Sequence, residues 1–464
     1  MTLKRCGSGL LRLILFAGIL STLSSASPSF AQSRTPQSPQ SLSLPARDVP
    51  LLLRILRAED ERKVDNELLN LLRDPQANIR HRVAIALGRI GELSAVAALA
   101  DTLERDRDPD VRAAAAFGIG EIAAPEGIEA LSKALNRTAE PQVVHARAVE
   151  ALGKIAASLS AEKHSRQLKL ISDEITRVLN DETAHRNASL RRETTLAAIT
   201  AALRARMSGA GPAIYRFLKS DDARIRADAA NTLARLRIKG AIPQLEVLLA
   251  DDDARVRANA ARALGVAESR SSVEKLITFL QKESDERARI SAIRALAAIK
   301  DGRALASLQE RADSLLPAYR RRQVSDPIHP REINELLEIA VAFGQIGTLA
   351  NDDGRIMKIL QELHVGERMT APEVEIALAR LSASQYLSDV RVPVKALRDW
   401  RAVSAVGQGL GEIANATQNA GGAANLQSVS SASKLVLLTL LAEVRTPALA
   451  VPDLSARAGC LQNR

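Results

Sequence analysis

The fold is decided by a segment that occurs twice with few changes, as DDARIRADAANTLARL (221–236) and, 31 residues later, as DDARVRANAARALGVA (252–267). Three further copies follow the same pattern: PQANIRHRVAIALGRIG (75–91), DPDVRAAAAFGIGEIA (108–123) and SDERARISAIRALAAI (284–299). A sixth copy, EPQVVHARAVEALGKIAA (140–157), follows it less strictly. Copies that recur at an interval of about 30 residues are typical of proteins built by stacking small units.

Aligning the copies places one apolar residue of each in the same column. Neighbouring members are 31 to 33 residues apart, except for one gap of 81, which holds a further copy around Leu190 and Arg191. The column contains Ile79, Val111, Val144, Ile225, Val256 and Ala288. This regular interval predicts a repeat array over residues 51–310.

Each copy predicts two helices. An Asp precedes the first helix in four copies, where its carboxylate can accept hydrogen bonds from free backbone N–H groups; these are Asp108, Asp222, Asp253 and Asp285. The second helix carries apolar residues at helical spacing, as in Val273, Leu276 and Leu280. Because no segment alternates between apolar and polar residues, we expect an all-α fold with essentially no sheet.

The composition agrees with thin helical layers. Only ten of the 464 residues are aromatic, whereas 46% are apolar. Such a core must be built from Ala, Leu, Ile and Val, which counts against β-sandwiches and barrels. It also counts against sites that stack sugars or unpaired bases on aromatic rings.

The pattern D-x-x-V-R-x-x-A-x-x-A-L-G-x-I, followed by a second Leu-bearing helix, resembles HEAT repeats. It is most similar to the short bacterial type related to phycobilin-lyase subunits. The resemblance covers 51–310 and continues in divergent form over 332–414, where FGQIG (343–347) and GLGEIA (409–414) echo earlier copies. It implies an α-solenoid of stacked HEAT-like helix pairs, in which each pair is stabilised by its neighbours.

Residues 1–31 predict a signal peptide that is cleaved after Ala31. Lys4 and Arg5 precede an apolar stretch at 10–20, whose uninterrupted run is much shorter than the ~20 residues of a membrane-spanning helix. We therefore expect a periplasmic or secreted protein with no transmembrane segment in the mature chain. Residues 32–50, rich in Ser, Pro and Gln at their start, predict a linker.

Three segments after residue 310 differ from the repeats. Residues 311–331 hold Tyr319 followed by three arginines, and then a polar run with Pro327 and Pro330, and predict an exposed loop. Residues 415–433 are small and polar and predict a flexible low-complexity insertion. Residues 434–464 begin with an apolar helix, for which we favour covering the last repeat over docking a partner, and end in a tail.

An Arg follows the apolar column in most copies, and an acid often stands six residues before it. The arginines are Arg80, Arg112, Arg191, Arg226, Arg257 and Arg289, and the acids include Asp74, Asp106, Asp251 and Glu283. We interpret them as a structural ladder of ion pairs between repeats, because the acids accompany the arginines. The alternative is a basic strip that receives an anionic ligand.

Arg320, Arg321 and Arg322 form the densest basic cluster in the sequence. A run of charge can simply be a solvated surface. It can also contact an acidic protein, a phosphate or an anionic membrane surface. These three arginines are our candidate residues for partner binding.

No motif indicates a catalytic residue, a cofactor or a metal. A dinucleotide-binding fingerprint needs a strand before its glycines, and no strand is predicted before Gly118 and Gly120. We interpret these glycines as sites of close helix packing or of helix termination. No histidine is adjacent to Glu, unlike the iron-binding His-Glu pairs of the HEAT-repeat enzyme deoxyhypusine hydroxylase. Cys6 would be lost with the leader, so Cys460 could form neither an intramolecular disulfide nor a cysteine-based metal site.

We therefore expect a non-catalytic scaffold, monomeric, that binds a protein partner on the extended concave face of the solenoid. The net charge of +10 makes an acidic partner one alternative without specifying it. The resemblance also implies a second hypothesis, an accessory or lyase-like chaperone subunit of an enzyme system. A basic-groove nucleic-acid binder is a third hypothesis, which the leader disfavours, so no nucleic acid is expected.

Overall fold

The structure is a computed structural model that describes residues 49–181, 188–321, 331–347, 354–366, 371–391 and 400–419, together with Val436. The predicted signal peptide and almost all of the 32–50 linker lie outside these ranges. So do residues 420–433 of the predicted insertion and the 434–464 segment apart from Val436.

The described residues form helices and no strand, in consecutive pairs. The first helices are α1 (Val49–Glu61), α3 (Ala77–Ile90), α5 (Pro109–Ile122), α7 (Gln142–Ser158), α10 (Ala188–Arg204), α12 (Ala223–Arg235), α14 (Ala254–Val266), α16 (Glu286–Ile299), α18 (Arg331–Ile346), α20 (Pro372–Leu381) and α22 (Trp400–Asn419). The second helices are α2 (Asn66–Asn70), α4 (Val96–Arg105), α6 (Ile128–Asn136), α8 (Ser165–Asn180), α11 (Gly211–Tyr215), α13 (Ile242–Val247), α15 (Val273–Lys282), α17 (Ala304–Arg321), α19 (Arg355–Gly366) and α21 (Ala383–Arg391).

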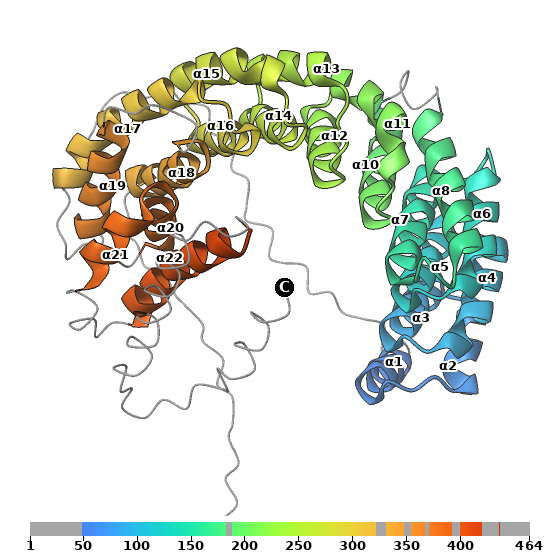
Figure 1. The fold of residues 1–464 in the computed structure, drawn as a ribbon. Helices are drawn as coiled ribbons and strands as arrows, with labels where there is room; N and C mark the ends of the chain where they lie inside the picture. The colour runs from blue at the N-terminus through green and yellow to red at the C-terminus, as the bar shows by residue number, and fades with distance from the viewer. Residues whose placement is uncertain are drawn as a thin grey trace, which may run out of the picture. The chain divides into compact units, whose positions relative to one another are not determined.

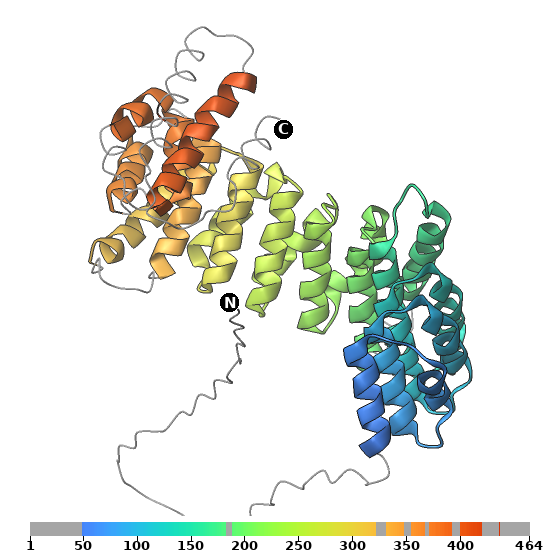
Figure 2. The same ribbon diagram turned by 90° about the horizontal axis from the view of Figure 1, so that it is seen from below.

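These helices lie in two layers, one of first helices and one of second helices (Figures 1 and 2). From α3 to α22, each first helix packs against the next first helix. Each second helix, together with any short 3-10 turn that extends it, packs against the first helix that follows it. Every pair is thus held by its neighbours, and the predicted all-α α-solenoid is confirmed.

The acidic residues before the first helices act as N-terminal caps. Asp222 accepts hydrogen bonds from the backbone N–H groups of Arg224 and Ile225, and Asp253 accepts one from Arg255. Asp108 and Asp285 cap α5 and α16 in the same way. Each cap satisfies donors that the first helical turn leaves free, as the sequence predicts.

Small residues let successive first helices approach closely. A Cβ on Gly265 would lie 2.6 Å from Cα of Ala295 on the next first helix, and a Cβ on Gly88 would lie 2.5 Å from Cα of Gly118. Gly118 and Gly120 both lie inside α5, against α3 and α7. Close packing, rather than helix termination, is therefore the role of these glycines.

The structure differs from the predicted loop at 311–331. Helix α17 continues to Arg321, with Pro317 inside it. A proline removes one backbone hydrogen bond from a helix, but the buried side chains of Leu315, Leu316 and Tyr319 hold this turn against the core. Residues 311–321 therefore belong to the array, and the predicted loop was wrong for that part. Pro327 and Pro330, on which the prediction rested, lie outside the described residues.

A second boundary also shifts. Helix α22 runs to Asn419, so the first residues of the segment predicted as a flexible insertion are helical. None of the described helices is long and apolar enough to cross a membrane.

Candidate functional site

The recurring arginines lie in the first turn of the first helices, where most of them contact both their own repeat and the next one. Nε of Arg80 donates to Oδ2 of Asp106 at 2.7 Å, and Nη1 donates to the backbone carbonyl of Asp74 at 2.9 Å. Nε of Arg257 likewise donates to Oε2 of Glu283 at 2.6 Å. The carboxylate thus comes from the following repeat, whereas the acid six residues before the arginine contributes its backbone oxygen.

Two further arginines have the same arrangement. Arg226 donates to both carboxylate oxygens of Asp251, at 2.7 and 2.9 Å, and Nε of Arg112 donates to Oε1 of Glu140 at 2.7 Å. The sequence analysis did not predict Glu140 as a ladder acid, because it stands four residues before the apolar column instead of five. The acidic side of this contact tolerates Asp or Glu and a shift of one position. We call these contacts the arginine ladder.

The ladder changes at two places. Arg191 pairs with Asp181, the acid that ends its preceding second helix. Arg289 shares Glu335 of α18 with Arg311 of α17, whose Nε donates to Oε1 of Glu335 at 2.7 Å. The carboxylate of Glu335 is almost fully buried and receives two guanidinium groups.

The ladder carboxylates are buried yet charged. Burial alone would raise the pKa of Asp106, but hydrogen bonds from Arg80 and from the backbone of Asp108 bring that pKa below its usual value. The pKa values of Asp251 and Glu283 are lowered in the same way, against burial, by Arg226 and Arg257. Arg80, Arg226 and Arg257 are therefore paired with carboxylates of neighbouring repeats and are not open to an anionic ligand.

The candidate cluster Arg320, Arg321 and Arg322 falls at the end of α17. Nε of Arg320 donates to Oε1 of Glu362 on α19 at 2.7 Å. Arg321 is exposed, and Arg322 lies outside the described residues. Arg320 therefore forms an ion pair between two second helices, α17 and α19.

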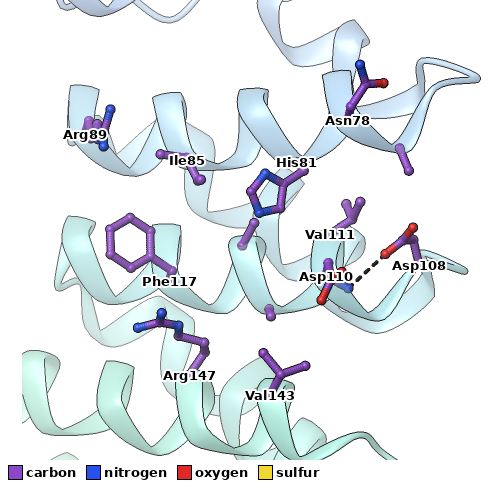
Figure 3. A pocket seen from close by; sticks show the side chains of 13 residues that line it. Asn78, His81, Ile85, Arg89, Asp108, Asp110, Val111, Phe117, Val143 and Arg147 are labelled. Carbon is purple, nitrogen blue, oxygen red and sulfur yellow. Dashed lines mark hydrogen bonds between the residues drawn. The ribbon is translucent and has the colours of Figure 1, made fainter. Parts of the chain in front are cut away.

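A pocket with a volume of about 470 Å³ lies where α3, α5 and α7 expose the side of the first helices that faces away from the second helices (Figure 3). Its apolar lining includes Ile85, Phe117 and Val143, one from each helix. Arg89 and Arg147 lie on either side of Phe117. The pocket thus joins an apolar surface to two guanidinium groups.

The other end of the pocket is polar and acidic. Asn78 and His81 of α3 lie opposite Asp108 and Asp110, at the start of α5 (Figure 3). Oδ1 of Asp108 accepts the backbone N–H of Asp110 at 2.9 Å, which fixes the first turn of α5. The two arginines therefore lie toward one end of the pocket, together with Phe117, and the two carboxylates lie toward the other end.

Phe117 is only partly buried and has a cation beside it. Nζ of Lys154 lies 4.8 Å from the centroid of the Phe117 ring, a distance at which a cation is attracted to an aromatic face. The same ammonium group lies 2.7 Å from Oε1 of Glu121 and 2.9 Å from Oε1 of Glu150. These contacts position Lys154 against the ring.

The sequence contained a signal for this pocket that we did not use. Six residues after the apolar column, Ile85 and Phe117 are apolar, whereas later copies have Asn231, Arg262 and Arg294. An apolar residue in a column that is otherwise polar marks an exposed apolar surface.

A buried pair also escaped the sequence analysis, which found no histidine adjacent to Glu. Nδ1 of His364 on α19 lies 2.6 Å from Oε1 of Glu375 on α20, and both side chains are buried. Burial, and then the charge of Glu375, raise the pKa of the neighbouring Tyr386. Among the described residues, no group of three or more His, Cys, Asp or Glu side chains could hold a metal ion.

Comparison with protein families finds HEAT repeats at residues 96–169 and 242–325. These ranges run from α4 into the first residues of α8 and from α13 through α17, so the match falls in both halves of the array. No curated protein matches the chain.

Several solved structures are similar in fold. The karyopherin Kap121p, bound to the extreme C-terminus of the protein phosphatase Cdc14p, is 13% identical, with a TM-score of 0.50 over 87% of this chain and 51% of the karyopherin. An engineered protein is 20% identical over 81% of this chain and 98% of its own, with a TM-score of 0.42. The complex of CpcE and CpcF of phycocyanin lyase from Nostoc sp. PCC7120 is 18% identical over 60% and 94%, with a TM-score of 0.33. At these identities the likeness concerns the fold alone.

Proposed function

We propose that this HEAT-repeat α-solenoid is a non-catalytic, secreted or periplasmic scaffold that binds a protein partner on the exposed face of its first helices. HEAT-repeat solenoids are typical of protein-interaction scaffolds. The observation that carries the proposal is the pocket on α3, α5 and α7, in which the partly exposed ring of Phe117 lies between Arg89 and Arg147.

The chemistry of this pocket suits a polypeptide. Aromatic and arginine side chains contribute a large share of binding energy at protein interfaces, especially where an apolar centre is surrounded by polar groups. Here the ring of Phe117 lies between two guanidinium groups at one end of the pocket, and the carboxylates of Asp108 and Asp110 lie at the other end. A partner segment that carries an apolar and an acidic residue side by side, followed by a basic residue, would match both ends.

Site-specific photo-crosslinking tests this proposal. A photoreactive amino acid replaces Asn78, at the rim of the pocket, in residues 32–464, and the protein is incubated with solubilised envelope proteins of its own source. We expect a defined cross-linked product that disappears when Phe117→Ala is added. A photoreactive residue at Val247, which is 73% exposed in the second-helix layer, is the matched control. Equal cross-linking from both positions would contradict the proposal.

The location and oligomeric state are separate parts of the proposal. The secreted or periplasmic location rests on the residue pattern at 1–31. Amino-terminal sequencing of the protein recovered from its own cells should begin at Gln32. Light scattering of that protein should give the mass of a monomer.

The lyase-like alternative predicts a bound chromophore. Nothing in the described part of the chain favours it over a scaffold. Visible absorbance that remains with the mature chain through purification from its own cells would support this alternative instead.

A further inference from the structure

Six arginines lie on the exposed side of three neighbouring first helices and take no part in the ladder. We call them the arginine strip: Arg224 and Arg235 on α12, Arg255 and Arg262 on α14, and Arg287 and Arg294 on α16. All six side chains are exposed. Within each helix the two members are seven or eleven positions apart, which places them on one face.

The strip is distinct from the ladder arginines of the same helices. Arg226, Arg257 and Arg289 point to the turns between repeats, where each is paired with a carboxylate of another element. The three helices contain nine arginines but only two acids, Asp228 and Glu286. After the ladder is neutralised, the remaining positive charge belongs to the strip.

Nearby carboxylates neutralise only part of the strip. Nε of Arg224 lies 2.9 Å from Oδ2 of Asp228, and Arg294 pairs with Glu338 of α18. Nη2 of Arg255 lies 2.7 Å from Oδ2 of its own helix cap, Asp253.

The other three arginines have no such partner. Within the ranges that the structure describes, Arg235, Arg262 and Arg287 form no ion pair with a carboxylate. Arg262 instead donates to the amide oxygen of Asn231 at 3.2 Å. These three guanidinium groups are available to an external acid.

Apolar residues lie among these arginines. Val266 follows Arg262 by one helical turn on α14, and Ile290 lies between Arg287 and Arg294 on α16. Both side chains are partly exposed. The surface therefore offers a guanidinium group and an apolar contact within one helical turn of each other.

We infer that the arginine strip binds an acidic segment of a polypeptide in which carboxylate side chains alternate with apolar ones. This inference rests on the proposed function and names the chemistry of a partner that engages a second surface of the same layer. The planar guanidinium group matches a carboxylate through two parallel hydrogen bonds.

Two other anions fit the surface less well. A protein that binds nucleic acid needs dense positive charge where it contacts the phosphate backbone. Binding of unpaired bases also needs aromatic rings on which the bases stack. Helices α12, α14 and α16 contain no aromatic residue. A membrane would contact basic residues at the surface of a helix that inserts apolar side chains, but Val266 and Ile290 are only partly exposed between neighbouring helices.

Fluorescence anisotropy with residues 32–464 tests the inference. The probe is a fluorescein-labelled peptide of alternating Glu and Leu or Ala. The variant Arg235→Glu/Arg262→Glu/Arg287→Glu should bind this peptide at least about tenfold more weakly at low salt, because the three available guanidinium groups are reversed in sign. A Lys analogue of the peptide should not bind the wild type.

The matched control is Arg105→Glu/Arg166→Glu/Arg177→Glu, which makes the same change in net charge on exposed residues of α4 and α8. It should bind the acidic peptide as the wild type does. Equal weakening by both triple variants would overturn the inference, since binding would then follow net charge alone. Tighter binding of a single-stranded oligonucleotide, or of phosphatidylglycerol vesicles, than of the peptide would also overturn it.

The two proposals can fail separately. If the cross-linked partner at Asn78 survives the strip variant and the acidic peptide ignores the strip, the scaffold proposal stands and the inference fails. If the peptide depends on the strip but no partner cross-links at Asn78, the strip binds its acidic segment without the pocket, and the assignment of the pocket fails.

Discussion

Arg257 donates hydrogen bonds to both carboxylate oxygens of Glu283 in the next repeat, from Nε to Oε2 at 2.6 Å and from Nη2 to Oε1 at 2.8 Å. The Glu283 side chain is only 3% exposed. Removing one partner of a buried pair leaves the other charge without compensation. The arginine ladder therefore makes each repeat dependent on the one that follows it.

Arg257→Ala should lower the free energy of unfolding by about 3 kcal/mol, because Glu283 stays buried without its partner. Replacing both residues with apolar ones, as Arg257→Met/Glu283→Leu, should recover much of that loss. Urea denaturation with hydrogen exchange measures the effect repeat by repeat. Lys169→Ala, which breaks an exposed pair with Asp173, should cost less than about 1 kcal/mol. A similar loss in both single variants would contradict the special role of the ladder.

The ladder also predicts how stability depends on pH. The pKa of Asp106 is lower in the folded protein than its usual value, so its stabilisation is present above the unfolded pKa of about 4. It is lost as the pH falls through the folded pKa. Thermal unfolding of the wild type should therefore shift to lower temperature below about pH 4.

The variant Asp106→Asn separates this contribution from the rest of the protein. It should already be less stable at pH 7, because it loses the charge of the bond to Arg80, and it should lose less stability than the wild type on acidification. Circular dichroism melts at several pH values measure the difference. Parallel curves for the two proteins would show that Asp106 does not contribute.

Close approach of first helices predicts the effect of a single added methyl group. In Gly265→Ala the new Cβ would meet Cα of Ala295 at 2.6 Å, and backbone cannot give way as a side chain can. We expect a loss of about 1–3 kcal/mol, typical of overpacking. Gly302→Ala, with nothing within 4 Å of its Cβ, is the control and should unfold like the wild type. Equal stability of both variants would show that α14 and α16 can move apart freely.

The repeated architecture could be predicted from the sequence because it depends on local and periodic features. Caps such as Asp222, the apolar column and the recurring arginines all stand at fixed positions in each copy. The end of α17 could not be predicted in this way. Pro317 breaks the local rule for helices, and only tertiary burial of Tyr319 and its neighbours compensates for it.

The candidate surfaces were harder to predict because they combine residues of different repeats. The densest run of basic residues drew attention to Arg320, which the structure pairs with Glu362, 42 positions later. The arginine strip has no such run, since its members are separated by seven or more residues in one helix and about 30 between helices. Its signal was a second column of arginines, Arg224, Arg255 and Arg287, just before the apolar column.

The pair of His364 and Glu375 predicts a local weakness near the end of the array. Glu375 is fully buried, and Nδ1 of His364 lies 2.6 Å from its Oε1. His364→Ala would leave that carboxylate short of a partner, and we expect a loss of about 1–3 kcal/mol. Hydrogen exchange should accelerate in α19 to α21 and stay unchanged in α3 to α5. His81→Ala, at a partly exposed position, should change neither region.

The pocket predicts which single residue matters most for the partner. Phe117→Ala removes the aromatic ring that lines the pocket between Arg89 and Arg147, while its helix keeps its packing, because the side chain is only partly buried. We expect about tenfold or greater weakening of partner binding, the usual effect of truncating a central aromatic anchor. Leu93→Ala, which truncates a residue 56% exposed in the turn before α4, is the control and should leave binding unchanged. Titration of the cross-linked partner against both variants by calorimetry measures the difference, and equal affinities would move the binding surface away from Phe117.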